Sequence, residues 1–350
     1  MHMNSDRLAP IVPLLCRWFE ENRIDMPWRR DPTPYHVWIS EIMLQQTRIE
    51  AVIPYYERFL RELPTVEALS EVSDDRLMKL WQGLGYYSRA RNLKKAAQTV
   101  MREHGGQLPT KAEALRKLPG IGDYTAGAIA SIACGEAEPA VDGNVLRVVM
   151  RLYASDDDIM LQRTRHAVSE ALREVYPSGD DAGRFTEGLM ELGEQICIPN
   201  GTPRCDICPI RAYCQAASQG NPEQYPTRIV KKERRLETKT VLLLVSNGRY
   251  AIRKRSELGL LSGMWEFPNT DGSLTVEEIR ERLSPTGLEP QNITCCGKAK
   301  HIFSHVEWHM TGYTVVCESE SADYIWVTPD ELRFSYAVPT AFRAFLKQIL

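Results

Sequence analysis

Glu41 is the first residue whose surroundings point to chemistry. It lies in the segment WISEIMLQQT, close to Ile39, Ile42 and Met43. In a helix of 3.6 residues per turn, some of these apolar side chains share the face that carries the acid. Burial raises the pKa of a carboxyl group and lets it act as a general acid near neutral pH. The segment therefore predicts a buried general acid, with a surface glutamate as the alternative.

Asp142 is a second carboxylate that could take part in a reaction. It stands directly before Gly143-Asn144 and a predicted helix over residues 145–153. An aspartate in that place is most often an N-cap, which satisfies free backbone N–H groups. Its position alone leaves a structural and a catalytic role open.

A glycine turn, PGIG at residues 119–122, lies upstream of Asp142. Helical patterns flank it, one ending at Leu118 and one predicted over residues 125–134. Glycine supplies the positive φ values that tight turns require. Such a hairpin directs backbone N–H groups and a helix N-terminus at an anion such as a DNA phosphate. An ordinary helical hairpin is the alternative.

Four cysteines follow in a cluster with gaps of seven, two and five residues: Cys197, Cys205, Cys208 and Cys214. Such spacing indicates a metal site or disulfide pairing, and thiolates suit both zinc and an iron–sulfur cluster. The nine cysteines of the chain are too unevenly spaced for a secreted disulfide framework. The opening MHMNSDRLAP has no long apolar run, so neither a signal peptide nor a membrane helix is expected. The sequence predicts a cytoplasmic protein.

The whole-chain charge gives no signal for nucleic acid, because 43 lysines and arginines face 46 aspartates and glutamates. Any DNA contact must come from local patches. One candidate is WQGLGYYSRARN, where aromatic residues among glycines precede Arg89 and Arg91. This pattern is typical of a basic helix face exposed to solvent. It is also typical of a DNA contact in which an aromatic side chain inserts between bases and the arginines bind phosphates.

The length of 350 residues predicts two domains or one large one. The first part is mostly helical in pattern, with an extended proline-containing segment up to about Pro34. Its expected helices cover residues 11–22, Pro34 through Thr47, and 156–193 with a break at 177–180. A polar, basic stretch at residues 218–237 predicts a linker. Beyond it, strands are expected at 238–245, 250–254 and 309–317, and helices at 276–283 and 340–350.

These motifs together resemble the MutY-type adenine DNA glycosylases, a family of the helix-hairpin-helix iron–sulfur glycosylases. The segments that carry the resemblance are WISEIMLQQT, GLGYYSRARN, LPGIGDYTAGAIA, VDGN, the cysteine cluster and LLSGMWEFPN. The resemblance covers nearly the whole chain. It implies a mostly α helix-hairpin-helix glycosylase core with an iron–sulfur cluster domain at residues 1–217. It also implies a linker at 218–237 and an α+β Nudix-like C-terminal domain at 238–350.

The resemblance also implies roles for the two carboxylates. Glu41 would protonate N7 of an adenine flipped out of the duplex, so that the base leaves neutral. Asp142, held ionised by the helix N-terminus and oriented by Asn144, would stabilise the cationic sugar. Tyr124 would form a hydrogen bond near Asp142. The expected adenine pocket consists of Trp28, Arg29, Leu44, Gln46 and Glu187.

Further expected contacts are with DNA. The family resemblance assigns them to Gln45, Tyr86, Arg89, Arg91, Gly120 and Gly122, with Gln45 in the minor groove and Tyr86 between bases. Phe303, Ser304 and His305 would read 8-oxoguanine opposite the adenine, because a hydroxyl can bond to the groups that distinguish it from guanine. The expected partner is double-stranded DNA with an A:8-oxoguanine or A:G mispair, bound by a monomer that is nucleoid-associated if bacterial.

The expected cofactor is one [4Fe-4S] cluster on the four cysteines. The family pattern has six residues in the first gap where this chain has seven, within a loop that tolerates insertion. Tyr124 stands where glycosylase/lyases place a Schiff-base lysine, so an essentially monofunctional enzyme is expected. The helix around Glu277-Glu278 lacks the full acidic set of a Nudix hydrolase. The alternatives are an endonuclease III-like glycosylase/lyase, a thymine-mismatch glycosylase and a non-catalytic iron–sulfur DNA-binding protein.

Overall fold

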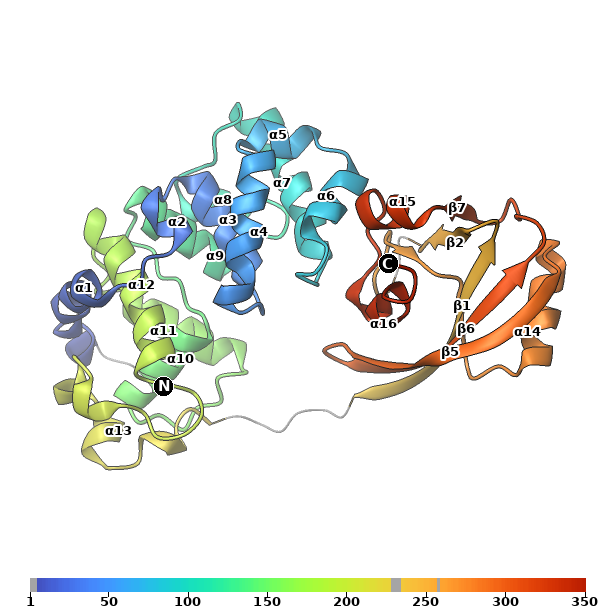
Figure 1. Cartoon of the computed structure of the whole chain (residues 1–350). Coiled ribbons are helices and arrows are strands. Elements are labelled where there is room, and N and C mark those ends of the chain that lie inside the picture. Colours follow the sequence, from blue (N-terminus) through green and yellow to red (C-terminus); the bar gives the residue numbers. More distant parts are fainter. Residues whose placement is uncertain (1–4, 228–233, 257–258) are drawn as a thin grey trace. The chain divides into compact units, whose positions relative to one another are not determined.

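The computed structural model describes residues 5–227, 234–256 and 259–350. The chain divides into two compact units (Figure 1). The first comprises Met1–Glu71 and Arg91–Val230, and the second comprises Val72–Ala90 and Lys231–Leu350. The predicted linker at 218–237 lies partly outside the described residues. No helix among those described is long and apolar enough to cross a membrane.

The first unit is helical throughout. Its helices are α1 (Ile11–Asn22), α2 (Pro27–Arg30), α3 (Pro34–Leu44), α4 (Ile49–Glu62), α5 (Val66–Glu71), α8 (Ala112–Leu115), α9 (Asp123–Ala128), α10 (Gly143–Leu152), α11 (Gln162–Arg173), α12 (Asp180–Gln195) and α13 (Gln215–Ser218), and α7 (Ser88–His104) spans the boundary between the units. Leu146 and Val149 of α10 pack with Leu189 and Leu192 of α12, and all four are fully buried. These two helices therefore carry the core beneath Asp142 and the cysteine segment.

Helix α3 positions Glu41. Pro34 occupies its first turn, where a missing N–H costs nothing, and the Thr33 side chain caps it by accepting from His36 N. Every residue from Val37 to Met43 is buried, as is expected of a helix that is apolar on all sides. The helix thus lies inside the unit and brings its one acid with it.

The helical boundaries differ from the predicted ones at three places. Helix α3 ends at Leu44 and not at Thr47, because Gln46 adopts a left-handed backbone with φ of 58°. The segment before Pro34 contains the short helix α2, since Pro27 at its first position favours a helical start. The predicted helix over residues 125–134 is α9 followed by a π-helical turn at Ile129–Ala133.

The second unit is built on a mixed sheet with strand order β3-β2-β1-β6-β5. Its strands are β1 (Arg235–Ser246), β2 (Arg249–Lys254), β3 (Trp265–Glu266), β4 (Asn269–Asp271), β5 (Pro290–Ile302), β6 (Val306–Cys317) and β7 (Ile325–Val327). Strands β1 and β6 run parallel, and β5 and β6 form an antiparallel hairpin. The hairpin places residues 303–305 at its turn.

Both faces of this sheet are covered (Figure 1). Val241 and Leu243 of β1 pack in one core with α15 (Pro329–Phe334) and α16 (Arg343–Leu346), while Leu242 and Leu244 pack in another with α14 (Val276–Leu283). This is the two-residue alternation of a strand. The C-terminal helix is shorter than the predicted 340–350, with a 3₁₀ turn at Thr340–Phe342 before α16.

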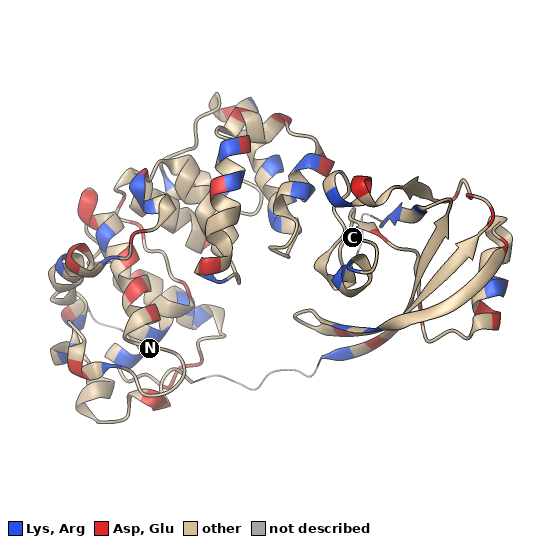
Figure 2. Cartoon of the chain, in the orientation of Figure 1, with Lys and Arg blue, Asp and Glu red and all other residues tan. Residues whose placement is uncertain are grey.

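Helix α6 (Asp74–Trp81) and the loop after it belong to the second unit. Residues 72–90 therefore group with the sheet, although the sequence reading assigned all of 1–217 to one core. Basic residues predominate along α7, where Glu103 is the one acid, whereas α6 begins with Asp74 and Asp75 and carries Arg76 and Lys79 after them (Figure 2).

Candidate active site

A cavity of about 580 Å³ in the first unit contains both predicted carboxylates. The structure brings to it all the residues expected in catalysis and in the adenine pocket, together with Gln45: Glu41, Tyr124, Asp142, Asn144, Trp28, Arg29, Leu44, Gln46 and Glu187. They come from α2, α3, α9, α10 and α12. The size and the mixed polar and apolar lining suit a small planar ligand.

Glu41 has the environment of a general acid. Its side chain is 7% exposed, and burial raises its pKa to about 7. The Tyr124 hydroxyl donates to Glu41 Oε2 at 2.5 Å and lowers that pKa, while the charge of Asp142 raises it. The carboxyl group is thus able to hold a proton near neutral pH and to release it to a base. Tyr124 was expected beside Asp142, but its hydroxyl bonds to Glu41.

Asp142 is the N-cap of α10. Its two carboxylate oxygens accept from Val145 N at 2.7 Å and from Asn144 Nδ2 at 2.9 Å. These bonds lower its pKa, but burial is the larger influence and leaves the pKa above the ordinary value. Desolvation thus opposes the effect of the helix N-terminus on this acid, and the ionised state expected of Asp142 stays a prediction. The predicted bond with Asn144 is present.

Arg147 holds Asn144 in place. Its Nη2 donates to Asn144 Oδ1 at 2.7 Å and to Gly193 O at 2.6 Å, and its Nε donates to Cys197 O at 2.7 Å. The arginine is 3% exposed and links Asp142, through Asn144, to the first cysteine. Arg147 was not among the residues predicted from the sequence. An arginine within the apolar run VLRVVMRL is nevertheless a sign of a buried guanidinium that has hydrogen-bond partners.

Arg29 is fixed between two acids of α12. Its Nε lies 2.7 Å from Glu187 Oε1, and its Nη1 lies 2.8 Å from Glu191 Oε2. Glu191 Oε1 also accepts from Ile24 N at 3.0 Å. Glu191 lies one helical turn after Glu187 on the same face, a spacing that could have identified it. These pairs hold a guanidinium at the wall of the cavity in one orientation.

The glutamines after α3 lie at the edge of the cavity. Gln45 Nε2 donates to Thr125 Oγ1 at 3.3 Å, and Gln46 is exposed with its backbone in the left-handed region.

The glycine hairpin is also formed. Gly120 has φ of 77°, and a Cβ there would lie 2.6 Å from Asn92 Cβ, so only glycine fits. Gly122 is exposed at the N-cap of α9, where N–H groups face solvent.

In the second unit, Tyr86 lies at the tip of the loop after α6, 46% exposed and with φ of 48°. Arg89 is 8% exposed and does not extend to solvent. Its Nη2 donates to Leu84 O and Gly85 O, and its guanidinium lies over the rings of Trp81 and Tyr86. The guanidinium of Arg89 thus binds carbonyls of the loop after α6 and does not face solvent. Its position gives no support to the expected contact with phosphate. Arg91 is partly exposed in the first unit.

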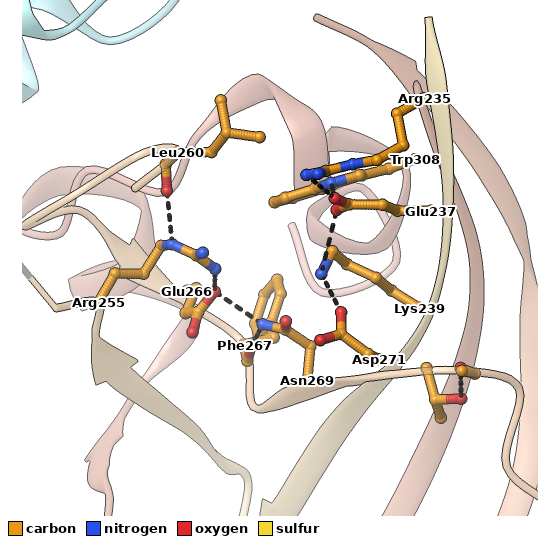
Figure 3. A network of polar contacts seen from close by, with 12 residues as sticks. Arg235, Glu237, Lys239, Arg255, Leu260, Glu266, Phe267, Asn269, Asp271 and Trp308 are labelled. Atoms are coloured by element: carbon orange, nitrogen blue, oxygen red, sulfur yellow. Dashed lines mark hydrogen bonds and ion pairs between the residues drawn. The ribbon is translucent and has the colours of Figure 1, made fainter. Parts of the chain in front are cut away.

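The turn between β5 and β6 carries the predicted lesion-reading residues. Ser304 and His305 are exposed, whereas the Phe303 ring packs on Trp308 at 4.8 Å between centroids. Figure 3 shows the polar network behind Trp308. Trp308 Nε1 donates to Glu237 at 2.8 Å, and Lys239 lies over the indole ring at 4.7 Å while pairing with Asp271 at 2.5 Å. This network fixes the ring on which Phe303 rests.

Glu278, expected within an incomplete Nudix box, is a structural residue. Its side chain accepts from Thr275 N at 2.7 Å, and the Thr275 hydroxyl accepts from Glu278 N, which makes a capping box for α14.

The four clustered cysteines line one small cavity with apolar walls formed by residues such as Leu152, Leu192 and Ile196. All four are free thiols, and Arg151 Nη1 lies 3.2 Å from Cys197 Sγ. In the part of the chain that the structure describes, no three His, Cys, Asp or Glu side chains form a group that could hold a metal ion. Four cysteines around one apolar cavity are a donor set that fits an iron–sulfur cluster, and thiolates also suit zinc.

Comparisons with known proteins identify the family of the chain. Residues 39–178 match the HhH-GPD superfamily of base excision DNA repair proteins, and residues 240–348 match the NUDIX domain. The adenine DNA glycosylase of Rattus norvegicus is 30% identical, covering 98% of this chain and 78% of that protein. That of Buchnera aphidicola subsp. Schizaphis graminum (strain Sg) is 33% identical, covering 85% of each.

A solved structure of a thermostable thymine-DNA glycosylase superposes with a TM-score of 0.56 at 27% identity, over 61% of this chain and 98% of that one. The predicted fold class, a helix-hairpin-helix core followed by a Nudix-like domain, is confirmed. Relatives at 30% identity and above align over most of their length and of this chain. The chain belongs to the adenine DNA glycosylase family.

Proposed function

We propose that the chain removes adenine from DNA in which adenine is mispaired with 8-oxoguanine or guanine, by hydrolysis of the N-glycosidic bond. The observation that carries this proposal is the pair of unlike acids in one cavity. Glu41 is buried with a pKa of about 7, and Asp142 caps a helix and accepts two hydrogen bonds. One acid can donate a proton while the other meets positive charge, as in glycoside hydrolysis.

The chemistry follows from the poor leaving ability of adenine. Glu41 delivers a proton to N7, and electrons of the N-glycosidic bond move to the base as it departs. Positive charge then develops at C1′ of the sugar, where the Asp142 carboxylate stabilises it. Water adds at C1′ and completes the hydrolysis. Asn144 orients Asp142 through its hydrogen bond to the carboxylate, and Arg147 holds Asn144 in place by donating to its side-chain oxygen.

The pocket residues recognise the base once it leaves the stack. Trp28 offers an aromatic face, and Arg29 offers donors to the base edge, with Glu187 holding the guanidinium. Gln45 and Gln46 contact the minor groove, Gly120 and Gly122 present N–H groups to phosphate, and Tyr86 enters the stack. Ser304 and His305 read the base opposite the adenine.

The four cysteines hold one [4Fe-4S] cluster as thiolates, and such a group can support structure or electron transfer. Arg151 bonds to the first of them, and Arg147 joins the carbonyl of the same residue to Asn144. The chain acts as a monomer, with the core at residues 1–217, the linker at 218–237 and the lesion-reading domain at 238–350. It acts in the cytoplasm, or at the nucleoid if bacterial.

A glycosylase/lyase is the second candidate, and it is disfavoured by Tyr124. A phenol replaces the amine that a Schiff base requires, and its hydroxyl is already bonded to Glu41. The test is single-turnover excision from duplexes with A:8-oxoguanine, A:G, A:T and T:G pairs, with borohydride present in parallel. We expect excision at A:8-oxoguanine and A:G and no covalent trapping. Excision of thymine, or efficient trapping, would favour one of the alternatives.

A further inference from the structure

The last turn of helix α6 is bound to the C-terminal domain. Lys79 Nζ donates to Tyr336 O at 3.0 Å and to Leu332 O at 3.4 Å, at the C-terminal end of α15. Leu332 belongs to the last turn of α15, and Tyr336 follows the helix. The last carbonyls of a helix lack partners within it and carry partial negative charge, so a lysine beside Leu332 O is favourable. Burial lowers the pKa of Lys79 to about 8. A half-buried ammonium group on two carbonyls is a specific contact between segments more than 250 residues apart.

Two further contacts fix the ends of the same helix. Gln82 Nε2 donates to Val338 O at 2.7 Å, directly after α6. At the start of the helix, Asp75 Oδ1 accepts from Trp265 Nε1 at 3.1 Å, and the Trp265 ring packs edge-on against Tyr336. The helix is thus attached to α15, to the segment after α15 and to β3.

The loop after α6 is held by hydrogen bonds of its own, and its tip lies beside the β5–β6 turn. Trp81 Nε1 donates to Gly85 O at 3.0 Å, and Arg89 holds the carbonyls of Leu84 and Gly85. Tyr86 at its tip lies with its hydroxyl 3.0 Å from that of Ser304. The position of Tyr86 relative to Ser304 therefore follows from where α6 is attached.

We propose that Lys79 and Gln82 are positioning residues for recognition of the base opposite the adenine. They attach α6 to the C-terminal domain, and so they hold the tip of the Tyr86 loop against the turn at residues 303–305. This inference rests on the proposed function, in which these two loops contact DNA together. Neither Lys79 nor Gln82 lines the cavity that contains Glu41 and Asp142, so the chemical step itself does not require them.

The test compares the full-length protein with Lys79→Met, Gln82→Ala and the double variant. The measured quantity is the ratio of single-turnover excision rates on A:8-oxoguanine and A:G duplexes. Each substitution removes hydrogen bonds between α6 or the residue after it and the C-terminal domain, so the ratio should fall about threefold in each single variant and about tenfold in the double variant. Lys79→Arg keeps the donors and should keep the ratio within about twofold of wild type. Lys347→Met, which removes an exposed lysine of the same unit, is the matched control.

Two more readouts separate positioning from general stability. Amide hydrogen exchange of residues 82–87 should quicken in the double variant while exchange in α10 stays unchanged. Adding Ser304→Ala to the double variant should lower the ratio of rates by less than the same substitution does in wild type. The reason is that the double variant has already disturbed the contact between Tyr86 and Ser304 that Ser304→Ala removes.

The inference is overturned if the double variant keeps the wild-type ratio, if both rates fall in parallel, or if the Ser304 effect is additive. A wild-type protein that excises adenine equally from both duplexes would instead overturn the proposed lesion preference. The two failures are therefore distinguishable.

Discussion

The Tyr124 hydroxyl donates a hydrogen bond to Glu41 Oε2 at a distance of 2.5 Å. The two residues come from α9 and α3, and Glu41 is buried while Tyr124 is half-buried. A hydrogen bond to the ionised form of an acid lowers its pKa, whereas burial raises it. Tyr124 therefore moderates the effect of burial on the general acid.

Replacing Tyr124 with Phe should shift the pH profile of excision. Without the donated hydrogen bond, the pKa of Glu41 rises above its value of about 7, and the acid keeps its proton to higher pH. The alkaline limb of the single-turnover rate should move to higher pH, since the general acid must be protonated to act. An unchanged limb, or one displaced to lower pH, would contradict this role of Tyr124.

Glu41→Gln should stabilise the protein at high pH. The unfolded chain ionises Glu41 near 4.5 and the folded chain near 7, so the free energy of unfolding falls as pH rises between these values. A glutamine side chain does not ionise, so the variant avoids the cost of a buried negative charge. Its free energy of unfolding should exceed that of wild type by on the order of 1–3 kcal/mol at pH 8 and by much less at pH 5. Thermal unfolding at the two pH values measures the difference. An equal gain at both would mean that ionisation of Glu41 is not the cause.

Gly193→Ala should impair catalysis through Asn144. A Cβ at residue 193 would lie 2.7 Å from Asn144 Cβ, closer than such atoms approach, and would displace the side chain that bonds to Asp142. We expect a loss of about tenfold or more in the excision rate, since misplacement near the reacting centre is costly. The control is Gly188→Ala on the same helix, whose Cβ would lie 3.2 Å from Leu15 O. That variant should lose stability but keep its rate, and an equal loss of rate in both would exclude an effect specific to Asn144.

The purified protein should contain about four irons per chain and absorb broadly at visible wavelengths. Cys205→Ser should lower the iron content and the affinity for DNA. It should lower the rate of adenine excision by DNA-bound enzyme less, because the cysteines lie outside the catalytic cavity. Metal analysis and binding isotherms provide the check. One zinc per chain in a fully active, iron-free protein would refute the cluster assignment.

Local patterns allowed much of the site to be predicted. The predicted helices at 11–22 and 276–283 coincide with α1 and α14, because amphipathic spacing and capping residues are visible in the sequence. Glu41 and Asp142 could be predicted because each lies in a short motif. Glu41 lies in the apolar segment WISEIMLQQT, and Asp142 lies directly before a predicted helix. Their predicted neighbours also lie in the same cavity.

Placement by residues distant in the sequence could not be predicted from local patterns. Arg89 looked like a solvent-facing cation, yet Trp81 and Tyr86 close around it in the folded loop. The pKa of Asp142 depends on burial by elements distant in sequence, and it exceeds what its capping role alone implies. The attachment of α6 to the C-terminal domain joins residues more than 250 apart, such as Lys79 and Tyr336, and no local pattern encodes such a contact.

That attachment also affects how lesion reading is best tested. Deleting residues from 238 onward would remove the partners of Asp75, Lys79 and Gln82 as well as the residues of the 303–305 turn. Point substitutions in the full-length protein avoid this. Ser304→Ala with His305→Ala is therefore the sharper choice.

The central claim is that two acids of one cavity, Glu41 and Asp142, remove adenine opposite 8-oxoguanine. The direct measurement is single-turnover excision from an A:8-oxoguanine duplex by wild type, Glu41→Gln and Asp142→Asn, with the affinity for the same duplex measured beside it. Wild type should excise adenine, and both variants should lose excision by about 10³-fold or more while binding the duplex within about tenfold of wild type. Near-normal excision by either variant, or loss of binding in step with excision, would contradict the account.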